Sequence, residues 1–105
     1  MSVSLMLHHK LTGDLREIPI ASQSGFVEGW LPICERLGLV WVPEFTGGAL
    51  TRVPKDLIPE ITRELELMLA EVKGNTEGEW ITERINYVLT AIAEVNPAEW
   101  EYSFG

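Results

Sequence analysis

The residues of this sequence whose types and spacing could do chemistry are two pairs of glutamates. Glu60 with Glu64, and Glu79 with Glu83, are four residues apart and would share one face of a helix. Paired carboxylates can act as acid and base where a pocket shifts their pKa values apart. Because nothing in the sequence predicts such a pocket, we expect these pairs to form a solvated face or an acidic binding face.

The other candidates for chemistry are His8, His9 and the single cysteine, Cys34. A zinc site usually needs three or four ligands, and adjacent residues of a strand point to opposite faces. Cys34 lies on the apolar stripe of an expected helix, where a buried thiol is unreactive. The sequence also has no nucleophile-elbow or phosphate-binding motif. We therefore predict that the protein is not an enzyme and has no metal site and no cofactor.

Hydrophobic patterns predict the elements that would carry these residues. Residues 3–8 alternate between apolar and polar, and so does the aromatic segment AEWEYSFG at the end of the sequence. Apolar residues recur at helical spacing in between. The predicted fold class is α+β, a small antiparallel sheet packed against about three helices in a single domain, 1–105. The sheet comprises the N-terminal and C-terminal strands, expected to be neighbours, and short strands near 15–20 and 39–42; the helices span 24–37, 56–73 and 77–95.

Boundary signals refine the three helices. Pro32 either kinks the first helix or separates a turn that ends near Gly29 from a helix that starts around Leu31. Asp56 is the expected N-cap of the second helix. Thr76 is expected to open the third helix through a capping box.

Negative charge is concentrated in the second half of the chain. The net charge is −8, and ten of the sixteen acidic residues, but only three of the eight basic ones, lie between Glu60 and Glu101. Such a field repels nucleic acid and anionic membranes and attracts basic partners. We therefore predict a basic protein partner, with no binding to nucleic acid or membrane. The alternative is that the acidic residues only keep the protein in solution.

Aromatic and acidic residues together indicate where a partner would bind. Trp41 and Phe45 flank an irregular, glycine-containing segment, and aromatic residues surrounded by charge are typical of binding hot spots. The cytoplasm is the expected compartment, because one cysteine allows no internal disulfide and no apolar run approaches the length that spans a bilayer. The predicted partner-binding residues are Trp41, Glu44, Phe45, Glu79 and Glu83.

The acidic balance, the compact α+β order, the segment GFVEGWLPICERLGL and the terminal AEWEYSFG resemble the small immunity proteins of bacterial polymorphic-toxin systems. The resemblance implies a stoichiometric inhibitor that occludes a basic cognate toxin or enzyme through an acidic face. Charge complementarity would then speed association. The alternative is a small, self-associating structural or regulatory accessory protein of phage or mobile-element origin, for which a homodimer is possible.

Overall fold

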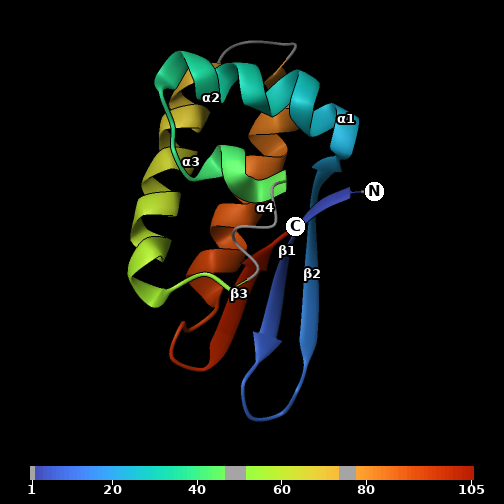
Figure 1. Cartoon of the computed structure of the whole chain (residues 1–105), viewed down its shortest axis with the longest axis vertical. Helices are drawn as coiled ribbons and strands as arrows, with labels where there is room; N and C mark the ends of the chain where they lie inside the picture. Colours follow the sequence, from blue (N-terminus) through green and yellow to red (C-terminus); the bar gives the residue numbers. More distant parts are fainter. Residues whose placement is uncertain (1, 47–51, 74–77) are drawn as a thin grey trace.

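The sheet is antiparallel and has three strands, in the order β2-β1-β3 (Figure 1). The structure is a computed structural model that describes residues 2–46, 52–73 and 78–105. The predicted α+β class is confirmed, and the first and last strands are neighbours as expected. Gly13, with φ of 77°, supplies the left-handed residue in the turn between β1 and β2. The strands are β1 (Ser2–His9), β2 (Leu15–Ser22) and β3 (Trp100–Phe104).

One continuous helical segment follows β2. The backbone N–H of Leu31 bonds to the carbonyl of Phe26, which defines a π-helical turn, and α2 begins where this turn ends. Pro32 therefore sits in the first turn of α2, where its missing N–H costs nothing, close to the second of the two predicted alternatives. The segment consists of α1 (Gln23–Gly25), the π-helical turn η1 (Phe26–Trp30) and α2 (Leu31–Leu37).

The two long helices each bury one apolar stripe, as their helical spacing predicted. The prediction of Asp56 as an N-cap was wrong, because a 3-10 turn that contains Asp56 runs directly into the helix. Thr76 lies outside the described residues. Within the described part of the chain, no helix is both long and apolar enough to cross a membrane. The elements are η3 (Lys55–Leu57), α3 (Ile58–Val72) and α4 (Glu79–Glu94).

The predicted short strand at 39–42 was wrong. This segment leads into the 3-10 helix η2 (Val42–Thr46). The backbone N–H groups of Val40, Trp41 and Val42 all donate to the carboxylate of Glu64, at 3.2, 3.0 and 3.0 Å. Successive N–H groups of a strand point in opposite directions, so three that converge on one carboxylate cannot belong to a ladder.

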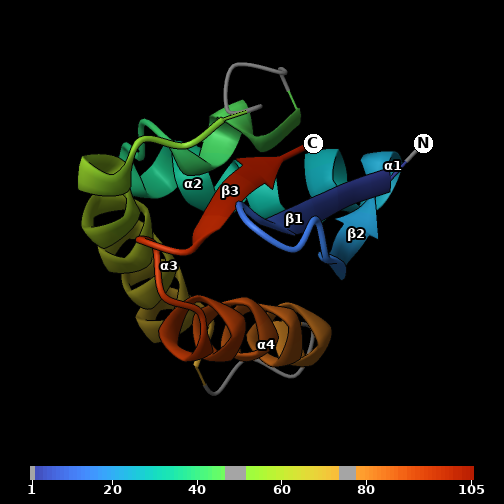
Figure 2. The ribbon, with the colours of Figure 1, turned by 90° about the horizontal axis from the view of Figure 1, so that it is seen from below.

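The hydrophobic core lies between the sheet and the helices. In Figure 2, α4 lies beneath the sheet. Tyr102 and Phe104 of β3 point to the same face of the sheet, and Phe104 stacks on Phe45 of η2. Tyr102 of β3 ties the sheet to α4, because its hydroxyl donates to the carbonyls of Val95 and Ile92 at 2.7 and 3.2 Å. The arrangement leaves β2 at the margin of the molecule, with α4 beside it.

Candidate functional site

Phe45 cannot contact a partner, and its prediction as a binding residue was wrong. Its side chain is 0% exposed and stacks on Phe104, with ring centroids 3.9 Å apart. The cause is the 3-10 helix η2, which has three residues per turn and therefore places Val42 and Phe45 on one face. That face is buried in the core.

Trp41 and Glu44 remain at the surface, but the structure gives Trp41 a second role. Its indole Nε1 donates to the Oε2 of Glu60 at 3.1 Å, and its ring is half-buried against the core. Glu64 is only 2% exposed, so the expectation of a solvated face was wrong for this residue. Both carboxylates of the first predicted pair therefore hold the segment from Val40 to Val42 in place.

Glu79 and Glu83 are exposed and lie in the first two turns of α4. Trp41 and Glu44 lie at η2, where Trp41 bonds to Glu60 of α3, so the predicted site residues are divided between different elements. The structure brings Trp41 and Glu44 together at η2. It places Glu79 and Glu83 on α4, where Glu83 lines a hollow.

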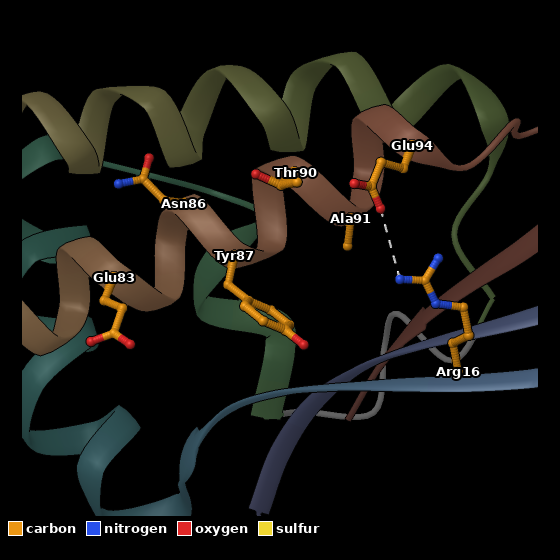
Figure 3. A pocket seen from close by; sticks show the side chains of 7 residues that line it. All are labelled: Arg16, Glu83, Asn86, Tyr87, Thr90, Ala91 and Glu94. Atoms are coloured by element: carbon orange, nitrogen blue, oxygen red, sulfur yellow. Dashed lines mark ion pairs between the residues drawn. The ribbon is translucent and has the colours of Figure 1, made fainter.

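The hollow is a groove of about 380 Å³ between α4 and β2, here called the α4–β2 groove (Figure 3). Arg16 reaches into it from β2, and its Nη2 lies 3.9 Å from the Oε2 of Glu94. The ring of Tyr87 hangs from α4 towards the strand. The groove is lined by Arg16 of β2 and by Glu83, Asn86, Tyr87, Thr90, Ala91 and Glu94 of α4.

Two exposed aromatic residues of α4 were missed by the sequence analysis. Tyr87 is 52% exposed and Trp80 is 42% exposed. Trp80, Glu83 and Tyr87 follow each other at spacings of three and four, so they share one face of α4. A signal for them existed, because both aromatic residues fall between the buried positions of the helical stripe rather than on it. Together they place large apolar surface beside the acidic residues.

Two glycines of the preceding helical segment allow the Trp80 ring to lie close against it. A Cβ at Gly29 would lie 2.8 Å from the Trp80 ring, and one at Gly25 would lie 3.8 Å from it. The ring thus lies close to the backbone of the π-helical turn, which only a residue without a side chain allows at position 29. Trp80 as a whole nevertheless stays 42% exposed.

His9 and Cys34 both make contacts within the fold. The Nδ1 of His9 accepts backbone N–H bonds from Leu11 and Thr12 at 3.2 and 3.1 Å, which shapes the turn after β1. Cys34 is buried against Met68, with 3.9 Å between the sulfur atoms. Burial, together with the Glu64 carboxylate, raises the pKa of the Cys34 thiol to about 12. Among the described residues, no three His, Cys, Asp or Glu side chains gather as a metal site would require.

The groove, the exposed aromatic rings and the acidic first turns of α4 lie together along this helix. Comparison with known proteins adds no neighbour from which a role could be transferred. No family model, no curated protein and no solved structure matches this chain.

Proposed function

We propose that this protein is a cytoplasmic, non-enzymatic inhibitor of the immunity type, which occludes a basic protein partner through α4 and the α4–β2 groove. The observation that carries the proposal is the placement of Glu83 beside the exposed ring of Tyr87 in a groove at the margin of the sheet. Carboxylates select a basic partner, and exposed aromatic rings supply the apolar contact area that binding hot spots need.

The test begins with capture of the partner by the tagged protein from an extract of the native host. The captured protein is then expressed alone and together with this chain. We expect a basic protein that is toxic alone and is neutralised by co-expression. The absence of a stable partner, or a partner whose toxicity persists on co-expression, would contradict the proposal.

Charge reversal then identifies the binding surface. We expect Glu79→Lys with Glu83→Lys to weaken binding by about a hundredfold or more, because each new lysine repels a basic partner across the interface. The matched control is Glu66→Lys with Glu99→Lys, which changes the net charge equally at exposed positions outside the α4–β2 groove. Isothermal titration against the purified partner measures both variants. If the two pairs weaken binding of the partner equally, the acidic residues of α4 serve only to keep the protein in solution.

A further inference from the structure

The outer edge of β2 carries backbone groups that have no partner among the described residues, and the register gives their positions. The N–H of His9 donates to the carbonyl of Asp14 at 2.8 Å and its carbonyl accepts from the N–H of Gly13 at 3.1 Å, so the backbone groups of His9 face β2. Every second residue of a strand faces the same neighbour, so Leu7 also faces β2 and is hydrogen-bonded to Arg16, which lies opposite it. Leu15 and Glu17 therefore turn their N–H and C=O groups away from β1, towards the open margin.

The open edge of β2 is short, because the second half of the strand cannot pair regularly with another strand. Pro19 has no N–H to offer, and its carbonyl accepts Nη1 of Arg84 from α4 at 3.5 Å. This bond independently shows that odd-numbered residues of this stretch point outwards. A bulge in β2 follows, because the register with β1 shifts between Val3 and Ser4. In the part of β2 before Pro19, the outward backbone groups are thus those of Leu15 and Glu17.

Charges on both faces of this edge fit basic side chains. In the α4–β2 groove, Glu94 faces Arg16, whereas Glu83 has no ion pair among the described residues. The exposed Tyr87 ring beside Glu83 offers a face to a cation. On the opposite face of β2, the exposed Glu17 is likewise without an ion pair in the described part of the chain. A strand added here would place a carboxylate near side chains on each of its faces.

A second copy of this chain fits the same edge poorly. A two-fold axis at Arg16 would set two arginines opposite one another, and an axis at Glu17 would do the same with two glutamates. An axis at Leu15 would carry the pairing into the turn at Gly13. An axis at Ile18 would need an N–H from Pro19. The edge is therefore suited to a different chain.

We propose that an extended, lysine- or arginine-bearing segment of the protein partner adds to β2 as a fourth strand at Leu15 and Glu17, with a basic side chain in the α4–β2 groove between Glu83 and Tyr87. The identity of the partner in this proposal rests on the proposed function. Backbone bonds of the added strand supply affinity, and the groove selects the side chain, as in other cases of strand addition.

The experiment uses a synthetic probe, a nine-residue peptide of valine and lysine with lysine on both faces of the extended chain. The ¹⁵N-labelled protein is titrated with this peptide and followed by backbone amide chemical shifts and hydrogen exchange. We expect the amides of Leu15 and Glu17 to shift and to become protected from exchange. The same peptide with glutamate in place of lysine is the control, and we expect it to bind at least about tenfold more weakly.

Two matched pairs of variants separate backbone from side-chain recognition. Glu17→Pro removes the outward N–H but no bond to β1. We expect this variant to weaken binding of the peptide at least about tenfold more than Glu17→Ala does. Tyr87→Ala should weaken binding of the peptide about fivefold. Tyr87→Phe keeps the ring and should bind the peptide like the natural protein. Circular dichroism verifies that each variant is folded. If Glu17→Pro proves unfolded, strand addition is tested instead by whether the peptide protects the amides of Leu15 and Glu17 from exchange in the natural protein.

Several outcomes overturn the proposal. They are equal binding of the lysine and glutamate peptides, unchanged exchange at Leu15 and Glu17, and a dimer of the free protein in which these two amides are already protected. Failure here leaves the proposed function standing if the host partner is captured and neutralised, because the partner would then bind in another manner. Failure of capture with successful peptide binding would contradict the proposed function instead.

Discussion

Glu64 is the residue whose role differs most from what its sequence position indicates. It sits among exposed glutamates on the helical pattern of α3, yet it is 2% exposed and its carboxylate accepts three consecutive backbone N–H groups. Bonds to an ionised acceptor are stronger than neutral ones, and here they offset the cost of burying the charge. The carboxylate thereby takes the place that a neighbouring strand would otherwise fill for the segment from Val40 to Val42.

Replacing the carboxylate of Glu64 should therefore destabilise the fold. Glu64→Gln puts an amide donor in place of one acceptor oxygen, which leaves one of the three converging backbone N–H groups facing a donor and removes the charge from the acceptor of the others, and we expect a loss of about 2–3 kcal/mol in the free energy of unfolding. Urea denaturation followed by circular dichroism measures the loss. Glu60→Gln is the matched control, because Glu60 is exposed and bonds only to the Trp41 indole, so its loss should stay below about 1 kcal/mol. An unchanged midpoint for Glu64→Gln would show that the carboxylate does not hold this segment.

At the scale of elements, periodic patterns of apolar residues predicted the helices and strands that have one face in the core. The stripes of α3 and α4 and the alternation of β1 and β3 record which side faces the core, so these elements could be predicted. The segment at 39–42 could not, because its conformation depends on Glu64, which is more than twenty residues away. The burial of Phe45 depends in turn on the 3-10 helix that follows this segment.

The candidate site was predictable only in part, for the same reason. Glu83 could be found from the concentration of acidic residues, and Tyr87 from its place off the buried stripe. The edge beside them results from the strand order β2-β1-β3, in which β3 takes the other side of β1. Strand order is set by contacts between distant segments, which no local pattern of residues encodes.

Pro19 lacks the outward N–H that a pairing of β2 with a second copy of the chain, centred on Ile18, would need. Pro19→Thr restores an outward N–H and permits a two-fold pairing centred on Ile18, which sets no like charges opposite one another. We expect this variant to form a dimer whose population rises with protein concentration, as measured by sedimentation velocity. Ser103→Thr, a substitution in β3 away from this edge, serves as the control. A Pro19→Thr protein that stays monomeric at high concentration would show that Arg84 closes this edge without the proline.

At the scale of the whole molecule, a small basic cluster lies at the opposite end of α4 from Glu79 and Glu83, and Glu101 offsets part of its charge by pairing with Arg52. Lys10, Arg52 and Lys55 line a cavity of about 150 Å³ beside β3, together with residues just beyond the end of α4. Glu79 and Glu83 lie in the first turns of α4, roughly 20 Å away along a helix with a rise of about 1.5 Å per residue. That distance exceeds twice the Debye length of about 8 Å at physiological salt, so the two regions act independently on an approaching partner.

The stability of the whole molecule should fall at alkaline pH. Burial raises the pKa of Cys34 from 9.0 to about 12, with the Glu64 carboxylate adding to the effect, and burial also raises the pKa of Tyr102. Above pH 9 the unfolded chain releases protons that the folded chain retains, so the free energy of unfolding decreases as pH rises from 9 towards 12. Below pH 9 both states keep these protons and the contribution is fully present.

Urea midpoints at pH 7, 9 and 10.5 measure this decrease. We expect Cys34→Ala to begin less stable, because it leaves a cavity beside Met68, but to lose less stability between pH 9 and 10.5. The thiol of the folded natural protein should also react slowly with a disulfide reagent at pH 8 and rapidly in urea. Identical pH profiles for the two proteins would exclude Cys34 as the cause.

The pairing of β1 with β3 has a consequence for how the protein folds. Ser4 and Gly105 exchange two backbone hydrogen bonds, at 3.1 and 3.0 Å, and Leu5 lies opposite Phe104. Contacts of such high sequence separation close a loop over nearly the whole chain, which slows folding relative to a helical protein of the same size. On the ribosome, β1 and β2 can form a hairpin early, but the sheet cannot be completed until Trp100–Phe104 has left the exit tunnel. Until then the unpaired side of β1 is a surface that chaperones can bind.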